Sequence, residues 1–108
     1  MSRNIFIAGT GTDVGKTIVA AIITQKLEAD YWKPIQAGNL YDTDTMTVQR
    51  LVSNAISSFH HETYRLQVPA SPHDAASQEE IRIDEDVIKP PQTDQALIIE
   101  GAGGLMVP

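Results

Sequence analysis

The hydrophobic positions of the chain fall into short apolar runs separated by longer segments with helical spacing. Residues 4–8 (NIFIA) and 96–100 (ALIIE) are apolar and rich in β-branched side chains, which is typical of strands buried on both faces of a sheet. Residues 17–29 are apolar all round at first and polar near their end, which predicts a helix packed on that sheet. Strands that alternate with helices predict a parallel α/β sheet with residues 4–8 and 96–100 as neighbouring central strands.

The segment between these strands contains shorter predicted elements. Residues 31–33 (YWK) precede Pro34, which cannot continue a sheet ladder, so any strand there ends near Lys33. Residues 42–55 predict a helix with Thr43 or Asp44 as its N-cap. Residues 57–72 show no regular pattern.

Two further short helices are expected before the last strand. Ser71 is a suitable N-cap with Pro72 at the first helical position. Asp84 is a suitable cap for a second helix, which must end before Pro90 and Pro91.

Composition narrows the classes of protein that fit. A chain of 108 residues with 42% hydrophobic residues has room for one small domain with a core. The net charge of −6 argues against general binding to nucleic acid or an anionic membrane. The absence of cysteine excludes disulfides, thiolate metal sites and cysteine nucleophiles, and suits a reducing compartment. With no long apolar run and no signal-peptide pattern in residues 1–8, we expect a cytoplasmic protein.

The connection between the first strand and the first helix carries the strongest chemical signal. Residues 9–17 (GTGTDVGKT) combine three glycines with Lys16 and Thr17. Unpaired backbone N–H groups at a helix N-terminus attract phosphate oxygens, Lys16 adds a point charge, and the Thr17 hydroxyl is placed to bind Mg²⁺. The leading glycine, Gly9, lies one residue earlier than in the strict P-loop pattern. The alternative is a glycine turn with a solvated lysine, but the coincidence of strand, glycines, Lys-Thr and helix favours phosphate binding.

Two carboxylates are candidates to complete a metal site. Glu100 ends an apolar strand, so it should emerge at the same edge of a parallel sheet as the glycine loop. Thr17, Asp44 and Glu100 offer the hard oxygen ligands that Mg²⁺ prefers. For Asp44 the alternative is an ordinary helix cap. For Lys33 it is a strand-end lysine that extends into water, and His60, His61 and His73 show no metal-ligand spacing, so we interpret the first two as loop residues.

Five segments, in this order and spacing, closely resemble those of the dethiobiotin synthase family, ATP-dependent carboxylases that close the ureido ring in biotin synthesis. They are GTGTDVGKT, KPIQAG, DTMTVQ, SPHDAA and IEGAGG. The resemblance implies a P-loop NTPase-like parallel sheet flanked by helices. It also implies a reaction of 7,8-diaminononanoate, CO2 and MgATP, carried out by a homodimer.

The resemblance also implies roles for individual residues. Lys16 would hold the β- and γ-phosphate oxygens, and Thr12 and Lys33 would lie beside the carbamate and the γ-phosphate, which makes these three the candidate catalytic residues. Mg²⁺ would be held by Thr17, Asp44 and Glu100. The full nucleotide-binding set would be Gly11, Thr12, Asp13, Val14, Gly15, Lys16, Thr17, Asp44, Glu100 and Gly103.

The chain departs from the family pattern in three respects. Ala37 stands where many relatives have Ser or Thr, so a hydroxyl contact to the substrate is lost there. The connection from the first helix to Lys33 is shorter than usual. Typical members are about twice as long, so we expect residues 1–108 to form the N-terminal part of a longer P-loop α/β domain.

Two other classes remain open. Partition and division-site ATPases share this loop topology, but they carry a second lysine at the position of Gly11. A nucleotide-binding module without chemistry would leave Lys33 and the SPHDAA segment unexplained.

Overall fold

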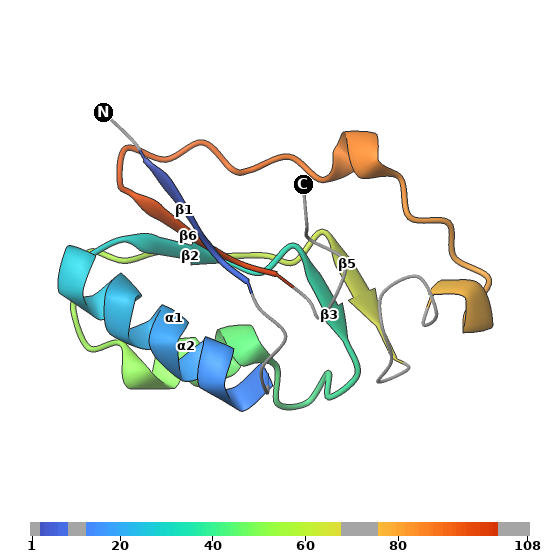
Figure 1. Cartoon of the computed structure of the whole chain (residues 1–108), viewed down its shortest axis with the longest axis horizontal. Coiled ribbons are helices and arrows are strands. Elements are labelled where there is room, and N and C mark those ends of the chain that lie inside the picture. The colour runs from blue at the N-terminus through green and yellow to red at the C-terminus, as the bar shows by residue number, and fades with distance from the viewer. Residues whose placement is uncertain (1–2, 9–12, 68–75, 102–108) are drawn as a thin grey trace.

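The computed structural model describes residues 3–8, 13–67 and 76–101 of the chain. Figure 1 shows the arrangement of the elements. In chain order they are β1 (Asn4–Ile7), α1 (Asp13–Leu27), β2 (Asp30–Trp32), β3 (Ile35–Ala37), α2 (Asp44–Leu51), β4 (Phe59–His60), β5 (Tyr64–Leu66), the 3-10 helix η1 (Glu85–Val87) and β6 (Leu97–Glu100).

The main sheet has four parallel strands in the order β1-β6-β2-β4. The parallel α/β fold expected from the pattern is confirmed, and β1 and β6 are parallel neighbours as predicted, with Asn4 opposite Leu97 and Ile7 opposite Glu100. The expectation that both strands are central is wrong for β1, which is an edge strand of the sheet formed by the described residues. Pairing therefore places β6, with its terminal Glu100, between β1 and β2.

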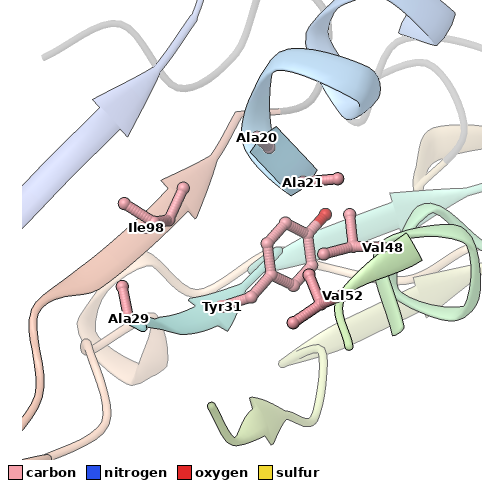
Figure 2. Packing of buried hydrophobic residues seen from close by; sticks show 7 residues of the cluster. All are labelled: Ala20, Ala21, Ala29, Tyr31, Val48, Val52 and Ile98. Atoms are coloured by element: carbon pink, nitrogen blue, oxygen red, sulfur yellow. The ribbon is translucent and has the colours of Figure 1, made fainter. Parts of the chain in front are cut away.

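Both long helices cover the same face of the main sheet (Figure 1). α1 contacts β6 and α2, and the small side chains Ala20 and Ala21 let its backbone approach the strands closely. Figure 2 shows these two alanines packed with Ala29, Tyr31, Val48, Val52 and Ile98. This cluster is the core between the helices and the sheet.

Alternation along the strands decides which side chains face the helices. Successive residues of a strand point to opposite faces. Tyr31 and Ile98 face the helices, whereas Trp32, Leu97 and Ile99 pack on the other face with Ile88 from the segment after η1. Two residues beyond Ile98, the same alternation turns Glu100 toward the helices.

Helix α1 begins earlier than the apolar pattern indicated. It runs from Asp13, not from Thr17, and ends at Leu27. Gly15 and Lys16 therefore belong to its first turns. A glycine near a helix N-terminus costs helix stability but does not prevent the turn from forming.

Helix α2 begins at Asp44 with Thr43, one of the two expected caps, as its N-cap, and it ends at Leu51, four residues before the predicted limit. The Thr43 hydroxyl accepts a hydrogen bond from the Met46 amide at 3.1 Å. A short 3-10 turn at Glu85–Val87 follows Asp84 and ends before Pro90, so this predicted helix is confirmed in a tighter form. Residues 76–78 are helical, whereas the predicted cap Ser71 with Pro72 lies outside the described residues.

Three short strands were not predicted. β2 ends at Trp32, close to the predicted limit before Pro34, but the chain resumes as β3 one residue after that proline. β3 pairs in parallel with β5 as a separate two-stranded sheet, and β4 extends the main sheet. Gly38, with a φ of 78°, ends β3, and its amide bonds to Leu66 at 2.7 Å. Strands of two or three residues show no period in the sequence, because their pairing partners are distant.

No helix within the described ranges combines the length and the apolar character needed to cross a membrane.

Candidate active site

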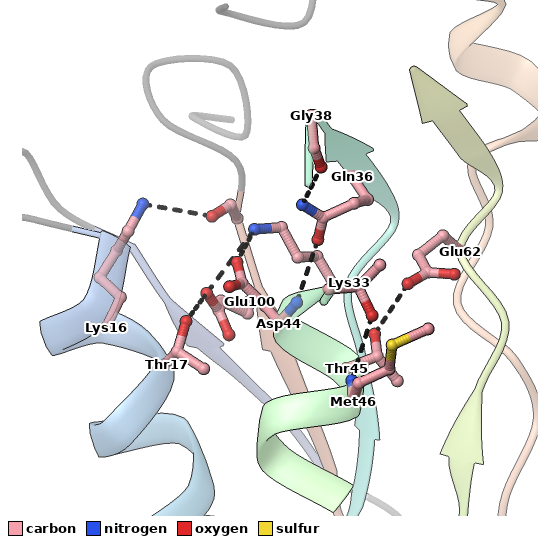
Figure 3. A network of polar contacts seen from close by, with 12 residues as sticks. Lys16, Thr17, Lys33, Gln36, Gly38, Asp44, Thr45, Met46, Glu62 and Glu100 are labelled. Carbon is pink, nitrogen blue, oxygen red and sulfur yellow. Dashed lines mark hydrogen bonds and ion pairs between the residues drawn. The ribbon is translucent and has the colours of Figure 1, made fainter. Parts of the chain in front are cut away.

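Polar and charged side chains from four parts of the fold meet at the carboxyl end of the main sheet (Figure 3). Lys16 and Thr17 come from the first turns of α1, Lys33 follows β2, and Glu100 ends β6. Asp44 begins α2 and faces Lys33. Parallel strands end at the same edge, which is where α/β folds bind ligands, so the structure brings together five of the predicted site residues.

Glu100 is the most deeply buried charged residue of this cluster, with no exposed surface. Its Oε2 accepts a hydrogen bond from the Thr17 hydroxyl at 2.9 Å, and its Oε1 accepts one from the Tyr31 hydroxyl at 2.6 Å. Burial raises the pKa of the Glu100 carboxyl, and the nearby negative charge of Asp44 acts in the same direction. The hydrogen bonds and the Lys33 charge oppose that rise without cancelling it. The site therefore favours additional positive charge beside Glu100.

Lys33 lies between the two carboxylates. Its Nζ donates a hydrogen bond to Asp44 Oδ2 and lies 3.8 Å from Glu100 Oε2. Only 4% of the residue is exposed, so the alternative of a lysine that extends into water is wrong. The shortened connection before it does not displace it, because β2 is in register with β6 through three residue pairs.

Asp44 is not the cap of its helix, because Thr43 performs that role. The Asp44 backbone amide instead donates to Gln36 Oε1 at 3.2 Å, and Gln36 Nε2 donates to the Gly38 carbonyl at 2.8 Å. The buried Gln36 side chain thus ties the start of α2 to the end of β3. This leaves the Asp44 carboxylate directed at Lys33 (Figure 3), and the helix-cap interpretation of Asp44 is wrong.

Lys16 reaches Gly101, the residue that follows β6. Its Nζ donates to the Gly101 carbonyl at 3.3 Å, and the Gly101 amide donates to the Ile7 carbonyl at 3.0 Å. Lys16 is 8% exposed. A lysine at the first turn of a helix, held against the end of the neighbouring strand, is suitably located to contact an anion at that edge.

The rest of the predicted phosphate loop is described only in part. Gly11, Thr12 and Gly103 lie outside the described residues, and for Asp13 and Val14 only the helical backbone is described. Gly15 lies within α1. The roles predicted for these six residues remain predictions.

The donor set suits Mg²⁺ better than a transition metal. Thr17, Asp44 and Glu100 offer only oxygen atoms, and the described residues contain no group of three or more His, Asp or Glu side chains that could enclose a metal ion. Mg²⁺ is usually held by one or two carboxylates, with water and phosphate oxygens as its other ligands. The buried, incompletely compensated charge of Glu100 also fits a cation, so these residues fit the ion.

Two residues of the site were not predicted. Tyr31 contacts Glu100, and burial together with the Glu100 charge raises the pKa of the Tyr31 hydroxyl, so that it stays protonated as a donor. A signal for it existed, because Tyr31 lies two positions before Lys33 and so shares its face of the strand. The signal for Gln36 was its place in the KPIQAG segment, because β3 was not predicted.

A parallel sheet with Lys-Thr at the start of the first helix and an acidic residue at the end of the neighbouring strand defines a P-loop NTPase-like domain. Comparison of sequences identifies the family: the chain belongs to the AAA domain family, whose pattern matches residues 3–108.

Curated relatives make the resemblance more specific. The chain is 52% identical, over its whole length, to the ATP-dependent dethiobiotin synthetase of Christiangramia forsetii. It is 50% identical over 98% of its length to the enzyme of the same name from Paramagnetospirillum magneticum, and 48% identical over its whole length to that of Agrobacterium fabrum. It covers 52%, 51% and 51% of these proteins, so it spans about half the length of the relatives it matches. The predicted resemblance to dethiobiotin synthases is confirmed.

Proposed function

We propose that the polypeptide carrying this chain is an ATP-dependent dethiobiotin synthetase. It converts 7,8-diaminononanoate, CO2 and MgATP to dethiobiotin, ADP and phosphate. The observation that carries the proposal is the convergence of Lys33 with Asp44 and Glu100 beside the Lys16-Thr17 turn of α1. Relatives that share about half of all positions carry this enzyme's name, which supports the same assignment.

The proposed reaction has three steps. An amine of the substrate adds to CO2 and loses a proton, which gives a carbamate. A carbamate oxygen attacks the γ-phosphorus while the bond from that phosphorus to the ADP oxygen breaks. The second amine then attacks the carbonyl carbon of the resulting mixed anhydride, and phosphate leaves with the C–O bond as the ring closes and the amine loses a proton.

Two lysines suit the anionic character of these species. The carbamate and the phosphates repel each other, so in-line approach of the oxygen needs cations held in advance between them. We assign Lys16 to the phosphate oxygens and Lys33, with Thr12, to the carbamate and the γ-phosphate. Because Lys33 is buried and already bound to a carboxylate, its ammonium group is oriented before substrate arrives. A pre-oriented group does not need to be reorganised during the reaction.

Magnesium would be held by Thr17, Asp44 and Glu100, and it would neutralise phosphate oxygens during transfer. Among these residues, Lys33 lies between the carboxylates of Asp44 and Glu100. Gly11, Asp13, Val14, Gly15 and Gly103 are assigned to nucleotide binding on the family pattern.

The proposal includes the organisation of the whole protein. Residues 1–108 would form part of a single P-loop α/β domain, and the active protein would be a cytoplasmic homodimer. The support for this proposal is that the chain spans about half the length of the relatives it matches.

The test is a phosphate-release assay on the complete natural polypeptide, with each substrate omitted in turn. We expect phosphate release that requires both 7,8-diaminononanoate and CO2, and a ring-closed product detected by mass spectrometry. Lys16→Ala should weaken ATP binding strongly in calorimetry, because it removes a charge that backbone N–H groups do not replace.

Two results would contradict the assignment. ATP hydrolysis at the same rate without the diamine would indicate a nucleotide switch of the partition type. ATP binding without turnover under any substrate combination would indicate a nucleotide-binding module. A sedimentation measurement that finds an active monomer would refute the dimer separately.

A further inference from the structure

A tyrosine of β2 holds one oxygen of the Glu100 carboxylate. Tyr31 has no exposed surface, and its ring packs in the helix-facing core with Val48, Val52 and Ile98 (Figure 2). Its hydroxyl emerges from that apolar packing to donate to Glu100 Oε1 at 2.6 Å. The ring is fixed by its neighbours, so the position of the hydroxyl is fixed as well.

Each of the two Glu100 carboxylate oxygens accepts a hydrogen bond from a different hydroxyl group. Tyr31 donates to Oε1, and Thr17 donates to Oε2 at 2.9 Å. The terminal torsion of a glutamate is soft, so a carboxylate with one donor can rotate, whereas donors on both oxygens define its plane. A short hydrogen bond from a hydroxyl to an ionised carboxylate is also among the stronger neutral-donor bonds in proteins.

The hydrogen bonds to the two oxygens also affect how the carboxylate lies relative to Lys33. Lys33 Nζ lies 3.8 Å from Oε2, too far for a direct hydrogen bond, although the charges attract. If the Tyr31 hydroxyl were absent, Oε1 would lack this donor in a buried position, and the carboxylate would gain by rotating toward Lys33. Such rotation would neutralise Glu100 through the lysine and withdraw it from Thr17.

We infer that Tyr31 is a positioning residue, which holds the Glu100 carboxylate beside Thr17 and keeps it available to a divalent cation. The inference rests on the proposed function, because it concerns the proposed metal ligands Thr17 and Glu100. Tyr31 itself contacts neither nucleotide nor metal in this proposal. It acts through the orientation of one carboxylate.

The first experiment measures Mn²⁺ binding, with Mn²⁺ as a probe for Mg²⁺, by electron paramagnetic resonance in the presence of ADP. The variant is Tyr31→Phe in the complete natural polypeptide, because phenylalanine keeps the ring and removes only the hydroxyl. We expect the Mn²⁺ dissociation constant to rise about tenfold or more, the usual effect of losing a residue that orients a metal ligand. Affinity for ADP measured without metal should stay unchanged, which a general defect in the fold would not allow.

Tyr64→Phe is the matched control. Tyr64 belongs to β5 in the second sheet, and its hydroxyl accepts a hydrogen bond from the Asp84 amide at 2.9 Å. It therefore loses a hydrogen-bonded hydroxyl of the same kind away from the site. We expect its Mn²⁺ affinity to equal that of the parent.

A second variant pair separates positioning from packing. In a Glu100→Gln background, Tyr31→Phe should cause no further loss of Mn²⁺ affinity, because the carboxylate that it orients is gone. Equal Mn²⁺ affinities of Tyr31→Phe and parent, or additive losses in the double variant, would overturn the inference. Failure of Tyr31→Phe to fold would also overturn it, because the hydroxyl would then be a structural requirement.

The same measurements distinguish this inference from the proposed function. If the parent binds no Mn²⁺ in the presence of ADP, the proposed function and the inference both fail. If the parent binds Mn²⁺ and loses it in Glu100→Gln but not in Tyr31→Phe, only the inference fails.

Discussion

A buried carboxylate lies near each end of strand β2, and the two differ in how well the surrounding protein stabilises their negative charge. At the carboxyl end, Lys33 and Tyr31 meet Glu100 on the face covered by the helices. At the amino end, Asp30 is on the opposite face and accepts hydrogen bonds from the Ser58 amide at 2.9 Å and the Thr93 hydroxyl at 2.6 Å. The two clusters are only a few residues apart in sequence, yet only one of them has the properties of a binding site.

The pKa shifts of the two carboxylates explain the difference. Burial alone would raise the pKa of Asp30, but hydrogen bonds with Thr93, His60 and the Ser58 amide together lower it. Burial raises the pKa of Glu100, and its donors do not outweigh that effect. The protein therefore stabilises the ionised form of Asp30, whereas it disfavours the ionised form of Glu100, and a cation bound beside Glu100 would oppose that effect. Burial of a carboxylate is not sufficient to identify a site; incomplete compensation of its charge is the more informative property.

The cluster at Asp30 also corrects one interpretation. His60 was expected in a loop, but it belongs to β4, and its Nε2 lies 2.8 Å from Asp30 Oδ2. Through Thr93 the same carboxylate ties the segment before β6 to the sheet. His61 does lie outside the strands, where its carbonyl accepts from the Trp32 indole at 3.0 Å, and His73 lies outside the described residues.

The largest expected effect is that of Lys33→Met at the carboxyl end. Turnover should fall by about a hundredfold or more, because the variant removes an oriented cation at the site of developing charge. Lys89→Met, which changes an exposed lysine near η1, serves as the control and should keep the parent rate. The check is phosphate release at saturating substrates. A Lys33→Met rate equal to the parent's would remove Lys33 from the catalytic group.

Glu100→Gln and Asp44→Asn should have the next largest effect. Each amide keeps the shape of the side chain and removes a charge that offsets the cation, so the half-saturating Mg²⁺ concentration should rise by about tenfold or more. Stability of the metal-free protein should be unchanged or higher in Glu100→Gln, because burial disfavours the ionised carboxyl. It should fall in Asp44→Asn, because that variant removes the ion-pair partner of buried Lys33. Turnover is measured against Mg²⁺ concentration. A variant with the parent's rate and Mg²⁺ dependence would show that its residue is not a ligand.

Asp30→Asn should give the reverse pattern. The amide group places N–H donors where the carboxylate accepted hydrogen bonds, so the free energy of unfolding should fall by about 1–3 kcal/mol. The Mg²⁺ dependence of turnover should not change. Urea unfolding of the same polypeptide measures the first quantity, and the phosphate assay measures the second. If Asp30→Asn changed the Mg²⁺ dependence of turnover and left the free energy of unfolding unchanged, the proposed difference between the two ends of β2 would be wrong.

The smallest expected effect is the pH dependence of the free energy that ionised Asp30 contributes to folding. Because the pKa of Asp30 is lower in the folded state than its ordinary value of 3.8, ionised Asp30 stabilises the fold above that value. The contribution is lost as the pH falls through the lower, folded-state pKa. The difference in unfolding free energy between parent and Asp30→Asn should therefore shrink below about pH 4. A difference that stays constant or grows below that pH would contradict the lowered pKa.

The sequence alone predicted the elements that have local signals. The apolar strands β1 and β6 contain enough β-branched residues to be recognised, and α2 has helical spacing after two candidate caps, Thr43 and Asp44. The Lys-Thr turn is also local, because a glycine loop and a helix N-terminus are consecutive in the chain. The sequence also predicted Lys33, Asp44 and Glu100 as site residues, and the structure brings them into one cluster.

Tertiary structure decided which of the open alternatives for these residues is correct. The Asp44 carboxylate binds Lys33, 11 residues away, instead of capping α2. Lys33 is buried beside Glu100, which is 67 residues away along the chain. The short strands β3, β4 and β5 exist only through pairing with partners distant in sequence. Hydrogen bonds and charge compensation depend on distances across the fold. Residue types and local spacing therefore indicated which chemical groups were available. They did not indicate that hydrogen bonds would stabilise the charge of Asp30 and that the charge of Glu100 would still favour a cation.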